Sequence, residues 1–235
     1  MLFHDFSFNG QLASDMGVIV ETQAEYVRPP KRVRQWTVPG RGGFLTQDEG
    51  EEAYDPVDLS PLCYLKPGAD AGRVGAWLNG AGQLVLGSQP EFAYRAQIIN
   101  QVPFSRLFQH SGSYMSFSPI FRCHPFRYHA TPDEDLVYTQ AGEIVNPGNV
   151  PARPRIIVVG TGDVMIQAGM AAYLYGLEDG VIIDSELEDC LTLDGANLIN
   201  DKLDGEFPLI PPGTWQVTWT GDITKVTITP RWRWI

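Results

Sequence analysis

Three residues of zinc-binding type lie close together in the stretch FSPIFRCHPFRYH, which runs from Phe117 to His129. Cys123 and His124 are adjacent, and His129 follows five positions after His124. A structural zinc site needs four such ligands in a tetrahedron, and this spacing supplies at most half of one. On a regular strand Cys123 and His124 point to opposite faces, because successive side chains alternate. The stretch therefore predicts a buried core thiol rather than a metal site.

Other patterns that could do chemistry are incomplete. The run IIDSELEDCLTLD holds five carboxylates but lacks the glycine-centred loop of a calcium site, and alternating acids indicate a solvated strand face. In VVGTGDVM, Met165 stands where the dinucleotide fingerprint needs glycine, so the segment predicts a hairpin turn. No nucleophile or carboxylate accompanies the histidines in a recognisable catalytic motif. We therefore expect no catalytic residue, no metal and no cofactor; the four histidines are His4, His110, His124 and His129.

Composition limits the classes of partner. The chain has 235 residues and a formal net charge of −11, and a surface this acidic repels phosphate backbones, which argues against specific nucleic-acid binding. The cysteines at 63, 123 and 190 lack the paired spacing of a disulfide framework and indicate a reducing compartment. No apolar run approaches the ~20 residues of a membrane span, and the amino end lacks the pattern of a signal peptide. We expect a folded, soluble protein made in the cytoplasm, without membrane insertion.

Strand signals cover most of the chain. Short alternating or apolar runs are cut at close intervals by Gly, Pro, Asn and Asp, which is typical of antiparallel sandwiches and barrels. In the clearest example Val226, Ile228, Trp232 and Trp234 share one face, while Lys225, Thr227, Thr229, Arg231 and Arg233 share a solvated one. Upstream, Trp215, Val217 and Trp219 alternate with polar residues, so residues 215–234 predict a hairpin that turns at Gly221 and Asp222. The fold class is all-β.

One short helix and one domain boundary are also predicted. In PGADAGRVGAWLNGAG, Val74, Trp77 and Leu78 fall on one side at helical spacing, and Gly80 or Gly82 could end the helix. The boundary lies where TPDEDLVYTQ and a proline-rich segment precede a fresh apolar run. We therefore place two domains, at residues 1–135 and 136–235.

Two glycine-containing stretches and the basic segment between them predict either an arm or an ordinary surface hairpin. FSFNG and WTVPGRGGFL place strand ends against glycines with conformational freedom, and EYVRPPKRVRQW between them is basic and stiffened by proline. An arm of this kind suits docking against a neighbouring molecule. Composition alone favours neither interpretation over the other.

Eight short motifs follow one another along the chain. In the first half they are FxFNG (6–10), DxGVxV (15–20), VPGRGG (38–43) and FxCxPFxY (121–128). In the second half they are NPG (146–148), AxPxI (152–156), IIDSE (182–186) and FPxIPPG (207–213). Most of them are built on Gly or Pro, but their order and spacing together resemble the distal tail protein family of long-tailed, non-contractile bacteriophages.

The resemblance implies a structural role at the tip of a phage tail. Proteins of this family have a β-rich first domain that assembles into a homohexameric ring and a second, galectin-like β-sandwich. The ring joins the tail tube protein to the tail-fibre or tail-associated lysin protein, carries receptor-binding proteins in some relatives, and leaves a channel through which DNA passes. The expected location is the tail tip of the virion, after synthesis in the host cytoplasm, and the expected role is not enzymatic.

The predicted arm and the implied ring together suggest candidate interface residues. A ring of one protein needs a head-to-tail interface, which strand edges of an arm can supply. The ring-interface candidates are Phe8, Asn9, Gly10, Arg32, Arg34, Pro39, Gly40, Arg41 and Gly42. The acidic run indicates either a solvated loop or a channel lining that repels DNA; its residues are Asp48, Glu49, Glu51 and Glu52.

Two other classes of function stay open from the residues. A carbohydrate-binding module for host cell-wall polysaccharide is the alternative to a hub. The alternation around Trp215, Trp219, Trp232 and Trp234 places these rings in the core rather than in a lectin site. A small hydrolase has no supporting motif.

Overall fold

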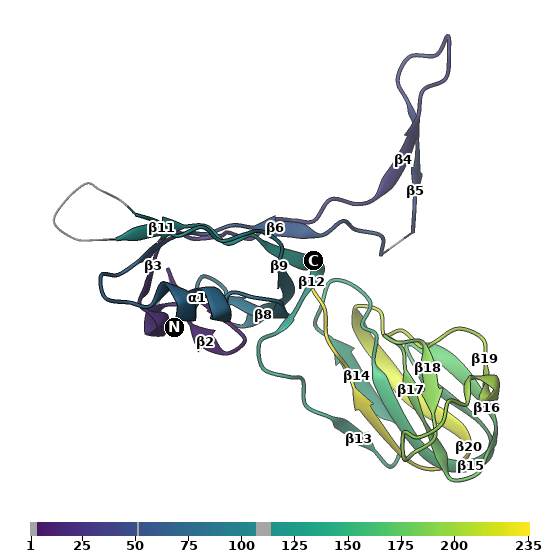
Figure 1. Ribbon diagram of the computed structural model, residues 1–235. Helices are drawn as coiled ribbons and strands as arrows, with labels where there is room; N and C mark the ends of the chain where they lie inside the picture. The colour runs from purple at the N-terminus through teal and green to yellow at the C-terminus, as the bar shows by residue number, and fades with distance from the viewer. Residues whose placement is uncertain (1–3, 51, 107–113) are drawn as a thin grey trace. The chain divides into compact units, whose positions relative to one another are not determined.

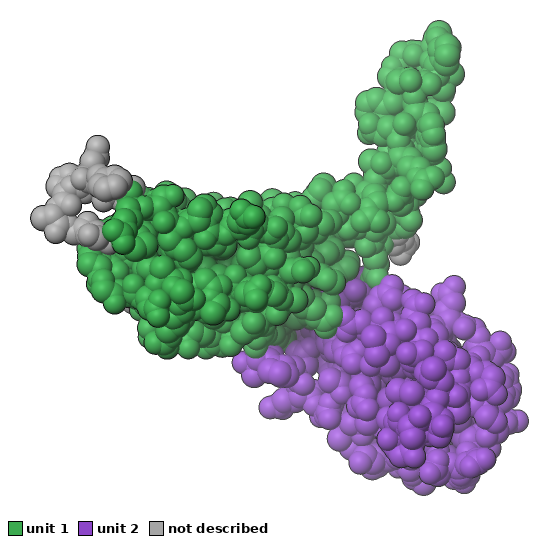
Figure 2. All heavy atoms as spheres, in the orientation of Figure 1, with its two compact units in different colours: residues 1–130, 235 green, residues 131–234 purple. Residues whose placement is uncertain are grey.

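The computed structural model describes residues 4–50, 52–106 and 114–235 and confirms a mainly β fold with one short α-helix (Figure 1). The chain divides into two compact units, residues 1–130 with 235 and residues 131–234 (Figure 2). Each unit has its own hydrophobic core. Within the described residues, no helix has the length and apolar character needed to cross a membrane.

The described residues of unit 1 form two larger antiparallel sheets and one separate two-stranded hairpin. The first contains six strands in the order β2 (Gln11–Leu12), β1 (Phe6–Phe8), β8 (Ala81–Leu86), β9 (Phe92–Ile98), β12 (Phe121–His129) and β6 (Val57–Leu59). The second contains four strands in the order β10 (Ser105–Arg106), β11 (Met115–Phe117), β7 (Leu62–Leu65) and β3 (Val18–Thr22). A 3₁₀ turn, η1 (Ser14–Met16), precedes β3.

An aromatic cluster holds the core of unit 1 together. The ring of Phe6 stacks on Trp77 at 5.7 Å between centroids and meets Phe121 edge-on at 5.5 Å. Trp77 lies in the predicted helix, α1 (Ala71–Trp77), and its indole Nε1 donates to the backbone oxygen of Phe8 at 2.9 Å. Asp70 caps the helix by accepting from the backbone N–H of Gly72 at 2.8 Å. The predicted helix is confirmed, and it covers the buried side chains of the six-stranded sheet.

Unit 2 is a sheet folded over itself into two layers, because two long strands run through both. These strands are β15 (Arg155–Ala168) and β20 (Gly213–Thr229), which pair with each other along their lengths. The first layer adds β13 (Leu136–Tyr138), β17 (Gly180–Asp184) and β18 (Asp189–Leu191). The second layer adds β14 (Gly142–Asn146), β16 (Met170–Leu177) and β19 (Leu203–Asp204), and a 3₁₀ turn, η2 (Asn200–Lys202), precedes β19.

Glycines permit the bend where the two layers meet. The pairing of β15 with β20 shifts register between 159 and 165, and a β-bulge of this kind bends both strands. A Cβ at Gly160 would lie 2.4 Å from the backbone oxygen of Asp222, and a Cβ at Gly221 would lie 2.6 Å from that of Asp163. Only glycine therefore allows the two backbones to approach this closely.

Both predicted hairpin turns in unit 2 are wrong, and for one shared reason. The Gly160 and Gly162 segment and the Gly221 and Asp222 pair lie within continuous strands, and Gly160 and Thr161 pair with Ile223 and Asp222. Here the turn-forming residues lie opposite each other on two neighbouring strands. They produce a bend rather than two turns, because each strand stays hydrogen-bonded to the other. Sequence spacing does not show that these segments face each other.

The carboxy-terminal segment also departs from the predicted alternation. Strand β20 ends at Thr229, Pro230 follows, and Arg231 has a left-handed backbone with φ of 54°. Arg233, predicted on the solvated face, is buried, and its Nε donates to the backbone oxygen of Pro151 at 2.9 Å. The alternation fails because it requires an unbroken strand.

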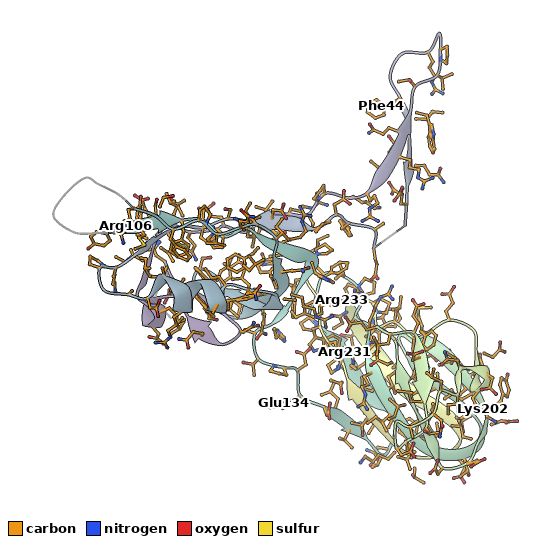
Figure 3. The ribbon with its side chains drawn as sticks, viewed as in Figure 1. Phe44, Arg106, Glu134, Lys202, Arg231 and Arg233 are labelled. Carbon is orange, nitrogen blue, oxygen red and sulfur yellow. The ribbon has the colours of Figure 1, made fainter. Side chains whose placement is uncertain are left out.

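A bidentate ion pair between Arg231 and Asp184 holds this segment to β17. Nη1 of Arg231, a residue labelled in Figure 3, donates to Oδ1 of Asp184 at 2.7 Å, and Nη2 donates to Oδ2 at 2.8 Å. Burial raises the pKa of Asp184, but the hydrogen bonds from Arg231 and from the backbone N–H groups of Leu187 and Glu186 outweigh it, so the pKa lies below its usual value of 3.8.

We expect Gly160→Ala to destabilise unit 2 by about 1–3 kcal/mol, because the added methyl group meets the backbone of β20 rather than a movable side chain. Urea unfolding followed by tryptophan fluorescence measures the change. Gly42→Ala is the matched control, since a Cβ there meets nothing within 4 Å and Gly42 does not have a positive φ. Equal stabilities of Gly160→Ala and the unchanged protein would contradict the proposed role of the bend.

We expect Asp184→Asn to lower the free energy of unfolding by about 1.5–3 kcal/mol at neutral pH, because it removes charged hydrogen bonds from a nearly buried side chain. A depressed pKa contributes stability that is complete above the pKa of the unfolded chain, about 3.9, and is lost as pH falls through the folded value. The unchanged protein should therefore lose stability below about pH 4 more steeply than the variant. Glu188→Gln, which alters an exposed pair with Arg153, is the control and should change stability by less than about 1 kcal/mol.

Candidate interaction surface

A two-stranded hairpin in unit 1 pairs with none of the described strands of the two sheets. Its strands are β4 (Val33–Trp36) and β5 (Leu45–Asp48), and every residue of both strands is exposed (Figure 1). Backbone contacts join its base to the following segment, including the bridge between Lys31 and Tyr54. A lone hairpin is marginally stable in water, so this element needs further contacts to be held rigidly.

Ion pairs fix the register of the hairpin near its base. Nζ of Lys31 lies 2.7 Å from Oδ2 of Asp48, and Nε of Arg34 lies 2.7 Å from Oε1 of Glu49. Nε of Arg32 lies 3.0 Å from Oδ1 of Asp55. These side chains are largely exposed, and each such pair contributes at most about 1 kcal/mol. They align the two strands but do not provide a core.

Large apolar side chains are exposed along the hairpin and its turn. Phe44, which is labelled in Figure 3, is 60% exposed, and Trp36 is 47% exposed. Trp36 and Leu45 are directly opposite each other in the ladder, so their side chains lie on the same face. Val33 lies on the opposite face, since it is three positions from Trp36 on the same strand. We call the exposed apolar residues on both faces of the hairpin and in its turn the hairpin patch: Val33, Trp36, Val38, Phe44 and Leu45. Patches of this kind mark interaction sites, because exposed apolar area is costly in water.

Six of the nine predicted ring-interface residues lie on this hairpin and its base, and all six are exposed: Arg32, Arg34, Pro39, Gly40, Arg41 and Gly42. Phe8 differs from the prediction, since its side chain is fully buried in the core of unit 1 and presents no surface to a neighbour. Asn9 and Gly10 form the two-residue turn between β1 and β2, with φ of 52° and 77°. Oδ1 of Asn9 also accepts from the backbone N–H of Gln83 at 3.0 Å, which fixes that turn locally.

The acidic run is partly neutralised by the opposite strand of the hairpin. Asp48 and Glu49 pair with Lys31 and Arg34, so the run carries less unbalanced charge than its sequence indicates. Glu52 is half-buried, and Glu51 lies outside the described residues. The proposed repulsion of DNA is correspondingly weaker than four unpaired carboxylates would give.

The structure confirms the predicted burial of Cys123 and the opposite facing of its neighbour. Cys123 is buried and His124 is exposed on β12, and the pairing of β12 with β9 shifts register between Cys123 and Arg127, around Pro125. Burial is the main reason why the pKa of Cys123 rises to about 12. Among the described residues, no group of three His, Cys, Asp or Glu side chains is arranged to hold a metal ion.

The apolar character of the hairpin is the feature that sequence reasoning missed. The motif WTVPGRGGFL drew attention to its glycines, but Trp36 and Phe44 at its ends are the residues that the fold leaves exposed. The available signal was the placement of large apolar residues directly beside a glycine-rich turn. Exposure itself could not be predicted, because the same residues beside a turn are usually buried.

Comparisons with known proteins find similarity in structure and not in sequence. No family model and no curated protein matches the chain. Among solved structures, it is similar to the SPP1 Dit (gp 19.1) protein, described as a paradigm of the hub adsorption apparatus in phages infecting Gram-positive bacteria. The TM-score is 0.73 at 14% identity, covering 98% of this chain and 99% of that chain. A chain in the activated baseplate of phage p2 gives a TM-score of 0.48 at 8% identity, covering 95% and 96%.

The first similarity establishes the fold over nearly the whole chain. At 14% identity it shows a shared architecture and carries no residue roles. The chain shares its fold with the SPP1 Dit protein, which agrees with the predicted resemblance to distal tail proteins.

We expect the three cysteines to resist alkylation in the folded protein. Burial is the main cause that raises the pKa of Cys63, Cys123 and Cys190 to about 12, and only the thiolate reacts. Intact-mass spectrometry after iodoacetamide treatment at pH 8 should therefore show no adduct, and three adducts after unfolding in urea. Rapid labelling of the folded chain would show that a thiol is reactive and accessible.

Proposed function

We propose that this chain is a structural hub of a phage tail tip and that six copies close into a ring. The observation that carries the proposal is the fold shared with the SPP1 Dit hub protein across 98% of the chain. That structural likeness supports a structural role in a phage tail or baseplate. The function proposed is assembly rather than catalysis.

The hairpin patch supports the assembly part of the proposal. A ring of identical subunits uses two different surfaces of each copy, one donating and one accepting. The hairpin presents strand edges that pair with none of the other described strands, together with the exposed rings of Trp36 and Phe44. These features suit it to be the donating surface. Full burial of one large apolar side chain contributes about 1.5–3 kcal/mol, so the hairpin patch can provide a substantial share of each contact.

The remaining parts of the proposal concern the partners. Unit 1 forms the ring, and unit 2 is a galectin-like sandwich carried by it. The ring lies at the tail tip of the virion, continues the tail tube protein and holds the tail-fibre or tail-associated lysin protein, with receptor-binding proteins as a further partner. DNA crosses its channel in passage, and the acidic run remains the candidate channel lining.

We expect the purified chain to have a solution mass near six times 26.1 kDa, measured by size exclusion with light scattering over a range of concentrations. Negative-stain images should show annular particles. The variant Trp36→Ser/Phe44→Ser should raise the concentration at which the hexamer dissociates by about a thousandfold, since two interface anchors at about 2 kcal/mol each weaken every contact by about 4 kcal/mol.

The control removes equally exposed apolar side chains from unit 2. Leu187 and Leu198 are 66% and 64% exposed, and Leu187→Ser/Leu198→Ser should leave the mass profile unchanged. A monomer at every concentration would contradict assembly by the chain alone. A hexamer that is insensitive to the hairpin variant would remove the hairpin from the interface.

A further inference from the structure

We propose that the outer face of the second layer of unit 2 binds a neutral polysaccharide chain, with Tyr173 and Tyr175 as stacking platforms. This layer consists of β14, the first half of β20, the second half of β15, β16 and β19. The proposal is independent of ring assembly, since it concerns unit 2 by itself.

The two tyrosines are exposed on the same side of one strand. Both lie in β16, each is 47% exposed, and the residue between them, Leu174, is fully buried. Residues two apart on a strand point to the same face about 6–7 Å from each other. Two aromatic rings at this spacing can stack on the apolar C–H faces of successive sugar units.

Short polar side chains surround the tyrosines on this face. Tyr173 pairs with Asp204 of β19 on one side and with Met165 of β15 on the other. Met165 in turn pairs with Thr220 of β20. The next outward-facing positions along β15 and β20 are Gln167 and Thr218, which are paired with each other. Hydroxyl and amide groups both donate and accept hydrogen bonds, as the hydroxyl groups of a sugar require.

The charge of this layer selects against anionic ligands. Its strands contain no Lys, Arg or His, whereas they contain the acids Glu143, Asp163 and Asp204. These acids outnumber Lys202, the basic residue that η2 places beside Gly176 of β16. The first layer differs, since Arg155 and Lys225 lie in the other halves of the same long strands. A polyanion would be repelled here, and a neutral polysaccharide would not.

The composition of the face also distinguishes it from the hairpin patch. Protein interfaces concentrate large apolar residues and arginine at their centre, as the hairpin does with Trp36, Phe44 and Arg41. The tryptophans of this layer do not serve as stacking platforms, because Trp215 and Trp219 pack against the core. Nε1 of Trp215 donates to the backbone oxygen of Pro211 at 2.9 Å. A face of tyrosine with Gln, Thr and Asp matches a polyol better than an apolar protein surface.

Affinity electrophoresis of the full chain tests the proposal. Native gels would contain dextran, mannan, galactan, xylan or soluble glucan, with polyglycerol phosphate as the anionic comparison. We expect at least one neutral polysaccharide to retard the chain. Tyr173→Ala/Tyr175→Ala should weaken that retardation by about tenfold, since two stacking contacts are lost.

Tyr114→Ala is the matched control, because Tyr114 is a tyrosine of unit 1 with 39% exposure. It should leave the retardation unchanged. The light-scattering mass of the double tyrosine variant should equal that of the unchanged chain, which separates loss of binding from loss of folding or assembly. The proposal is overturned by no retardation in any neutral polysaccharide, by retardation in polyglycerol phosphate alone, or by binding that persists in the double variant. A chain that is monomeric but still binds a neutral polysaccharide would contradict only the proposed ring assembly and would leave this inference intact.

Discussion

The close approach of two backbones at Gly160 and Gly221 is the constraint on which unit 2 depends. Because neither position has room for a Cβ, β15 and β20 bend together while staying paired, and one sheet becomes two layers. The bend brings the apolar faces of both layers into one core and leaves two outer faces of different chemistry. Tyr173 and Tyr175 lie on one of these outer faces because side chains alternate along β16, which places Leu174 inside and its neighbours outside.

Unit 1 buries most of its large apolar side chains in a core between its sheets and helix, but it leaves those of the hairpin exposed. Its sheets and helix bury the rings of Phe6, Phe8 and Phe121 in one cluster, so this part is self-sufficient. The hairpin has comparable apolar residues but nothing among the described residues covers them. Contact with another molecule is the physical means of removing that area from water, which connects this local feature with assembly.

Sequence reasoning succeeded where one element determines its own pattern. The helix at Ala71–Trp77 and the burial of Cys123 follow from spacing along a single segment. It failed where a second segment decides the outcome. Phe8 belongs to a core whose other members are distant in sequence, and the glycines of unit 2 produce a bend only because they face each other.

The sequence by itself determined the all-β class, the single short helix and the resemblance to distal tail proteins, because composition, local periodicity and motif order are properties of the chain alone. Only the tertiary structure decided which glycine-rich segments turn and which bend, and which aromatic residues remain exposed. Those outcomes depend on the backbone and side-chain atoms that other segments bring within contact distance, and neither spacing nor residue type records them.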